Sequence, residues 1–138
     1  MTAQYLWIAG SLMFLWLGTV HLYYTFFTNR FLAKDPETVQ GMKNTHPLLT
    51  NRTTMWDAWV GFNASHSMGA IFLGIINIIL ASQYLYVLKD SFSMLLLTMV
   101  TVLFYLFLAK KYWFKIPLAG IAVATICYGI ATILMLSE

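Results

Sequence analysis

The chain has 138 residues, of which 60% are apolar and 9% charged, whereas soluble domains carry charge on about 25% of their residues. This balance excludes an ordinary soluble domain, and the length fits a single domain. The formal charge of +3 arises from eight basic and five acidic residues. The basic residues lie between apolar stretches, so we expect them to set membrane topology and not to bind nucleic acid.

Four stretches of the sequence carry no charged side chain, namely residues 2–29, 58–88, 91–109 and 116–137. A helix needs about 20 apolar residues to cross a bilayer, and each stretch is about that long or longer. The sequence therefore predicts an all-α fold, an integral membrane four-helix bundle that forms one domain over residues 1–138. The expected helices span residues 5–27, 55–82, 91–109 and 116–136, with approximate ends.

The first predicted helix has small and polar residues along one side. Gly18, His21 and Thr25 lie broadly on that side by helical spacing. Small residues let membrane helices approach closely, so we expect this side to face another helix. Trp7 lies near the opposite end, where an aromatic side chain typically anchors a helix at the membrane–water interface.

The loop at residues 28–52 is the longest polar segment. Within it, KDPETVQGMKN predicts a short surface helix, because Asp35 is a good N-cap and Pro36 suits the first helical position. Seven of the eight basic residues lie in this loop or at residues 110–115. The positive-inside rule therefore predicts a cytoplasmic loop at 28–52 and both termini outside. We expect a short outer loop at residues 83–89.

The second predicted helix begins with many hydrogen-bonding residues, in TTMWDAWVGFNASHSMG. Thr54 and Asp57 have the spacing of a capping box, with the aspartate in the role of a glutamate. His66 lies beside one helical face, which carries Asn63, Ser67, Ala70, Gly74 and Asn77. An unsatisfied polar group in lipid costs several kcal/mol in order of magnitude. We therefore expect this face to point into the bundle.

These positions predict a ligand-binding site in the membrane. With a rise of about 1.5 Å per residue, His21 and His66 come to similar depths from one side of the membrane. The predicted ligand-binding residues are His21, Asn63, His66, Ser67, Asp57 and Trp59. Other interpretations stay open: Asn63 and Ser67 as hydrogen bonds that hold helices together, Asp57 as a helix cap, and Trp59 as an interface anchor.

The last two predicted helices carry weaker patterns. Thr98, Thr101 and Tyr105 recur with helical spacing. They either line the same cavity, or the threonines donate back to carbonyls of their own helix. The fourth helix has a packing face with Gly120, Ala124, Tyr128 and Ala131.

The motifs TTMW, WxGFNxSHSxG and GTVHLYYTFF resemble those of a group of uncharacterised small four-helix bacterial inner-membrane proteins. The likeness covers most of the chain and is clearest in the first two helices. It implies a multi-pass protein of the bacterial inner membrane and transfers no activity. The architecture also looks, more loosely, like that of DoxX-type four-helix proteins.

The polar site predicts that the protein binds a small membrane-soluble ligand, such as a lipid or a quinone-like molecule. One alternative is an accessory or assembly subunit of a larger membrane complex, or a homo-oligomer. Another is a redox protein with a b-type haem between His21 and His66. Whether the protein is an enzyme stays open, because the sequence has no paired carboxylates, HExxH motif, nucleophile elbow or phosphate-binding glycine loop.

Overall fold

The computed structural model describes residues 1–137, and every regular element in that range is a helix. The six helices are α1 (Thr2–Phe27), α2 (Pro36–Asn44), α3 (Met55–Gln83), α4 (Leu85–Asp90), α5 (Phe92–Tyr112) and α6 (Lys115–Ser137). Four of them, α1, α3, α5 and α6, are long and apolar enough to cross a membrane. This confirms the predicted all-helical class with four helices of membrane-spanning length.

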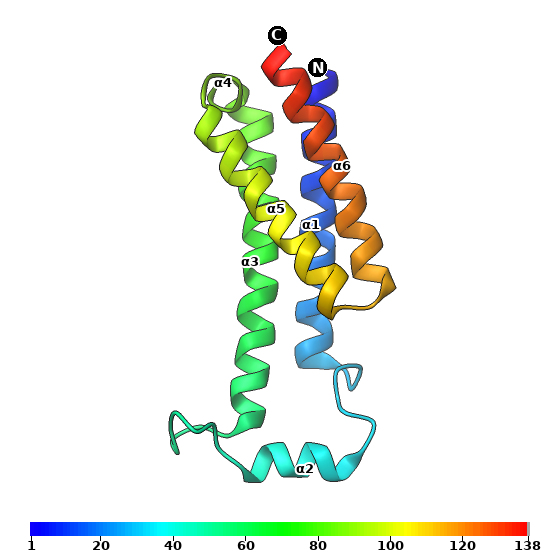
Figure 1. The fold of residues 1–138 in the computed structure, drawn as a ribbon, viewed down its shortest axis with the longest axis vertical. Coiled ribbons are helices and arrows are strands. Elements are labelled where there is room, and N and C mark those ends of the chain that lie inside the picture. Colours follow the sequence, from blue (N-terminus) through cyan, green and yellow to red (C-terminus); the bar gives the residue numbers. More distant parts are fainter. Residues whose placement is uncertain (138) are drawn as a thin grey trace. The chain divides into compact units, whose positions relative to one another are not determined.

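The helices pack into two compact units. Unit 1 consists of Met1–Leu17 together with the chain from Ala70 onward, and unit 2 consists of Gly18–Gly69. Helices α1 and α3 contribute one segment to each unit. In unit 1, the start of α1 and the end of α6 lie at the same end of the bundle (Figure 1).

In unit 1, buried residues recur along the helices in steps of three and four residues and form packing seams between them. In α6 the buried residues are Ile121, Ala124, Tyr128, Ala131 and Met135. A seam that alternates steps of three and four residues is typical of helices that pack at small crossing angles, as in left-handed bundles. The packing face predicted for the fourth helix is thus confirmed at Ala124, Tyr128 and Ala131. Outside the seams, side chains such as Leu97 and Ile126 are exposed, as suits contact with lipid.

The connection between α3 and α5 differs from the expected outer loop at residues 83–89, since it contains the short helix α4. Leu88 is fully buried, and its burial stabilises the short helix α4. The local sequence around Leu88 did not predict this helix. Ser91 ends α4 and also caps α5, because its hydroxyl accepts a hydrogen bond from the Met94 N–H at 3.4 Å.

Trp7 is not the interface anchor that we expected, because it lies fully buried in unit 1. Its indole Nε1 donates to Oδ1 of Asn77 at 2.9 Å, and its ring meets that of Tyr128 edge-on at 4.8 Å. Burial of a tryptophan is favourable when its N–H finds an acceptor. The acceptor here comes from another helix, which the local sequence does not reveal.

The two threonines of α5 behave differently from each other. Thr98 is buried and donates to Oδ1 of Asn77 at 3.4 Å. Thr101 donates to the Leu97 carbonyl of its own helix at 2.8 Å. Thr98 therefore joins a polar network between helices, whereas Thr101 satisfies its hydroxyl locally.

Helix α2 belongs to unit 2 and runs crosswise to the segments of α1 and α3 in that unit (Figure 1). Asp35 is its N-cap, as the sequence predicts, and accepts hydrogen bonds from the N–H groups of Glu37 and Thr38. Val39 and Met42 are the partly buried residues of this helix. Its other residues are exposed, which is the pattern of a helix that lies on a surface.

Candidate functional site

A hydrogen bond joins α1 to α3 within unit 2, between His21 and Asn63. The distance from Nε2 of His21 to Oδ1 of Asn63 is 3.0 Å. The amide nitrogen of Asn63 donates to the Trp59 carbonyl, one turn earlier, at 2.8 Å. Because a carbonyl oxygen only accepts, this second bond fixes the orientation of the amide and directs Oδ1 at His21. Nε2 of His21 therefore carries the hydrogen.

His66 lies next to this pair on α3. Its ring centroid is 5.5 Å from that of His21, with the rings at 72° to each other. The His66 ring is nearly parallel to that of Phe62, at 9° and 6.4 Å. The structure therefore brings together three of the residues predicted to bind a ligand: His21, Asn63 and His66. We call these three residues the polar cluster.

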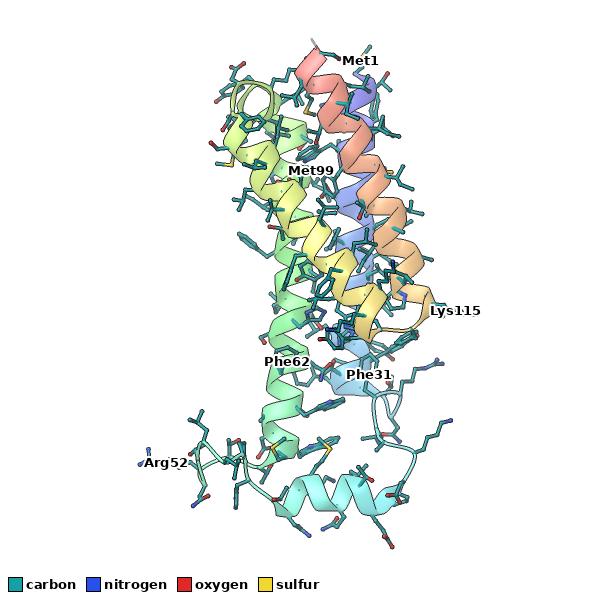
Figure 2. The ribbon with its side chains drawn as sticks, in the orientation of Figure 1. Met1, Phe31, Arg52, Phe62, Met99 and Lys115 are labelled. Atoms are coloured by element: carbon teal, nitrogen blue, oxygen red, sulfur yellow. The ribbon has the colours of Figure 1, made fainter. Side chains whose placement is uncertain are left out.

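Phe31 closes one side of the polar cluster, and its sequence position gave no sign of this. Its ring centroid is 4.5 Å from that of His21, 6.0 Å from that of Tyr24 and 6.4 Å from that of Trp59. Phe31 lies in the segment that follows α1, and Figure 2 labels both Phe31 and Phe62 in unit 2. The polar cluster is thus surrounded by aromatic rings from the loop and from α3.

The aromatic contacts continue from Trp59 toward the loop. The rings of Trp56 and Trp59 are stacked at 5.4 Å, and the ammonium of Lys43 lies 5.3 Å from the Trp56 ring. A cation over the face of an indole is attracted by the ring quadrupole. Trp59 therefore has two roles in unit 2, since it supports the amide of Asn63 through its backbone and contacts Phe31 through its ring.

Asp57 and Ser67 are engaged within α3 and its N-terminus. The hydroxyl of Thr54 accepts a hydrogen bond from the Asp57 N–H at 3.0 Å and donates to the Asp57 carboxylate at 2.7 Å. These bonds confirm the predicted capping box. Ser67 is buried and donates to the Asn63 carbonyl at 2.8 Å. Ser67 thus supports the backbone at Asn63, whereas Asp57 fixes the start of the helix.

The polar cluster lies near one end of the two spans. Helices α1 and α3 have 26 and 29 residues, so they measure roughly 39 and 43 Å, longer than the hydrocarbon core of about 30 Å. His21 comes six residues before the end of α1 and Asn63 eight residues after the start of α3. These offsets correspond to roughly 9 and 12 Å along the helix axes. In a bilayer that α1 and α3 cross, helix ends of this length extend past the hydrocarbon, which would bring the cluster close to the head-group boundary.

Hydrogen bonding among residues 1–137 is complete for buried groups, since each buried side-chain nitrogen or oxygen has a partner. His21 and His66 are partly buried. No group of three or more His, Cys, Asp or Glu residues in this range is arranged to hold a metal ion. The polar cluster therefore offers hydrogen-bonding groups and aromatic walls to a ligand.

Comparison with known proteins gave no match to a protein-family model, a curated protein or a solved structure. The fold itself defines the class, an all-helical protein with four helices that are long and apolar enough to cross a membrane.

Proposed function

We propose that the polar cluster of His21, Asn63 and His66 binds the head group of a small membrane-soluble amphiphile, such as a lipid or a quinone-like molecule. The hydrogen bond of 3.0 Å between His21 and Asn63, beside the His66 ring, carries this proposal. Ionisable residues inside spans are costly and mark functional sites by default. We therefore interpret the two neighbouring histidines in charge-free stretches as part of a binding site and not only as packing residues.

The aromatic surroundings support a ligand with a flat or ring-shaped head. The Phe31 ring lies 4.5 Å from the His21 ring and 6.4 Å from the Trp59 ring, and the Phe62 ring is nearly parallel to that of His66 at a centroid distance of 6.4 Å. Aromatic side chains with a few well-placed polar groups are typical of small-molecule sites. The position of the cluster near the ends of α1 and α3 supports a polar head near the boundary, with an apolar tail among exposed side chains such as Met68.

The hydrogen bond of His21 favours this function over a b-type haem between His21 and His66. Nε2 of His21 is engaged with Asn63, and ligation of iron through that atom requires loss of this bond. The purified protein is expected to lack a Soret band. A Soret band that His21→Ala removes would favour the haem instead.

The charge distribution supports the orientation of the chain in this proposal. Seven of the eight basic residues lie at 28–52 and 110–115, so these loops face the cytoplasm and both termini face outward. The resemblance to small bacterial four-helix proteins supports a location in the bacterial inner membrane. The polar cluster then lies in the cytoplasmic half of the membrane.

A thermal-shift assay in lipid nanodiscs tests the proposal. The probes are a decyl-substituted benzoquinone, its hydroquinone and an extract of bacterial lipids. We expect at least one probe to raise the melting temperature of the native protein, and His66→Ala to abolish this rise. Ser65→Ala is the matched control, because Ser65 is exposed on the same helix and its hydroxyl bonds to the Phe62 carbonyl. An equal rise in native protein and His66→Ala would exclude the polar cluster as the site.

A further inference from the structure

We infer that the ligand of the polar cluster presents a hydrogen-bond donor to Nδ1 of His21, and that this donor is the hydroxyl group of a quinol or of a lipid alcohol. The inference rests on the proposed function and specifies the chemistry of its ligand. It follows from the position of one hydrogen atom on His21.

The neutral imidazole has a single N–H, and a charged imidazolium is costly within a membrane span. Nε2 of His21 faces Oδ1 of Asn63, which only accepts, so the hydrogen lies on Nε2. Nδ1 then presents a lone pair. The side chain of Asn63 cannot turn over without losing its bond to the Trp59 carbonyl.

Nδ1 of His21 is an accessible acceptor. The hydrogen bond of the His21 imidazole within residues 1–137 is made through Nε2. Every fully buried side-chain nitrogen or oxygen in the described chain has a partner, so Nδ1 of the partly buried His21 is not fully buried. A lone pair near the hydrocarbon boundary is stabilised by a donor.

This arrangement distinguishes hydroxyl groups from carbonyl and ether oxygens. A hydroxyl donates to Nδ1, whereas a ketone, quinone or ether oxygen places one lone pair against another. Moving the hydrogen of His21 to Nδ1 loses the bond from Nε2 to Oδ1 of Asn63. If the amide turns over, its nitrogen donates to Nε2 instead, but the bond to the Trp59 carbonyl is lost. One hydrogen bond is lost in either case, which corresponds to a discrimination of about tenfold.

Matched ligand pairs test the inference in nanodiscs under anaerobic conditions. The first pair is the decyl-substituted hydroquinone and its dimethyl ether, and the second is dodecanol and its methyl ether. If the site binds lipid alcohols in general, we expect both hydroxyl compounds to bind at least tenfold tighter than their ethers. If the ligand is a quinol, we expect this difference for the hydroquinone alone. The decyl-substituted benzoquinone is expected to bind more weakly than the hydroquinone.

Asn63→Leu removes the acceptor that fixes the hydrogen on Nε2, and we expect it to reduce the preference for the hydroquinone while Ser65→Ala retains it. If Asn63→Leu does not fold, the relative affinities of the native protein for the matched ligands still test the inference. Equal or tighter binding of both ethers would overturn the inference and leave the proposed function intact. Absence of binding by all of these compounds and by the lipid extract would overturn both.

A separate observation concerns the loop between α2 and α3. The Thr50 N–H donates to the Pro47 carbonyl at 3.2 Å, so Leu48 and Leu49 are the central residues of a turn. Both side chains are fully exposed. Turn centres normally carry Gly, Asn, Asp or Ser, so two exposed leucines at this position indicate an apolar contact.

The base of this loop is fixed and lies next to a candidate span. Met55, the first residue of α3, donates through its N–H to the Thr45 carbonyl at 2.9 Å. Nδ1 of His46 donates to the Thr53 carbonyl at 2.8 Å. Since Leu49 comes six residues before Met55, the turn lies within about 20 Å of the start of the span.

The geometry points to insertion of Leu48 and Leu49 into the head-group region of the bilayer that holds α3. Figure 2 shows Arg52 projecting from the same loop. Apolar side chains beside a cation suit a membrane surface, where the leucines are buried and the arginine meets lipid phosphates. The loop thereby anchors the start of α3.

Fluorescence of a nitrobenzoxadiazole label tests this contact in nanodiscs that contain only this protein and phospholipid. In a Cys127→Ser background, Leu49→Cys carries the label and Asn51→Cys is the matched control. We expect a blue-shifted emission that spin-labelled lipids quench at position 49, and aqueous emission at position 51. Aqueous emission at both positions in nanodiscs would overturn the inference, and a blue shift confined to native membranes would point to a protein partner instead.

Discussion

The indole N–H of Trp7 donates to Oδ1 of Asn77 over 2.9 Å, and the two residues are 70 positions apart in the chain. The same oxygen accepts the hydroxyl of Thr98, and the amide nitrogen of Asn77 donates to the Leu73 carbonyl. One amide thereby satisfies groups from α1, α3 and α5. The network allows polar residues to be buried among the apolar helices of unit 1.

Asn77→Leu is expected to destabilise the protein by about 1–3 kcal/mol, because it leaves the buried N–H of Trp7 without its acceptor. Thr98→Val removes only the longer bond of 3.4 Å and is expected to cost about 0.6 kcal/mol, the average for hydrogen bonds between membrane helices. Chemical unfolding in detergent measures both values. A larger loss of unfolding free energy for Thr98→Val than for Asn77→Leu would show that the Asn77 amide is not the centre of this hydrogen-bond network.

Gly74 lies where the backbones of α1 and α3 approach closely in unit 1. A Cβ atom at this position would lie 2.8 Å from the Ser11 carbonyl oxygen and 2.8 Å from the Leu15 nitrogen. Since both are backbone atoms, the helices must move apart to accept it. Gly74→Ala is therefore expected to destabilise the protein by about 1–3 kcal/mol in the same unfolding measurement.

Gly129→Ala is the matched control for this substitution. It also lies within a helix, and an added Cβ there meets nothing within 4 Å. We expect a gain of about 0.5–1 kcal/mol, because alanine restricts the unfolded chain more than glycine does. Equal effects of the two substitutions would show that the close approach at Gly74 is absent.

The sequence was sufficient to predict the four long apolar helices, because charge-free apolar stretches of about 20 residues are typical of membrane-spanning helices and uncommon elsewhere. The inward face of α3 was also predictable, since exposure of Asn63 and Asn77 to lipid is unfavourable. Both helix caps were predictable from the local sequence, because Asp35 and Thr54 accept hydrogen bonds from N–H groups no more than three positions away. These features depend on short-range patterns that are visible in the sequence itself.

Other features depend on contacts between distant residues and were not predictable. Apolar and aromatic side chains are suited both to lipid and to a protein interior, so hydropathy does not tell a buried Trp7 from an interface anchor. Phe31 follows α1 in a polar segment, and only the fold brings it to His21. Helix α4 depends on the burial of Leu88.

The cap of α2 makes a prediction about pH. The hydroxyl of Thr38 at 2.6 Å and the N–H groups of Glu37 and Thr38 hold the pKa of Asp35 below its ordinary value of 3.8. A carboxyl with a lowered pKa in the folded state stabilises the fold above its unfolded pKa. This stabilisation is lost as the pH falls through the folded pKa, so we expect the cap to weaken below pH 3.8.

Nuclear magnetic resonance in detergent micelles measures this transition through the amide shifts of Glu37 and Thr38. Their midpoint is expected below 3.8, and Thr38→Val is expected to raise it, because the hydroxyl of Thr38 is the largest cause of the lowered pKa. In Asp35→Asn the side chain still accepts a hydrogen bond but no longer titrates. A midpoint at or above 3.8 in the native chain would contradict the cap as described.

The distribution of basic residues predicts the orientation of the chain, and labelling measures it. Segments 28–52 and 110–115 hold seven basic residues, whereas Lys89 alone lies in the connection from α3 to α5. Basic residues are retained on the cytoplasmic side during insertion. In a Cys127→Ser background in bacterial spheroplasts, an impermeant maleimide is expected to label Tyr86→Cys at once and Asn51→Cys only after lysis. Both positions are exposed, so accessibility within the protein does not bias the comparison. Immediate labelling of Asn51→Cys with protection of Tyr86→Cys would reverse the orientation and place the polar cluster in the outer half of the membrane.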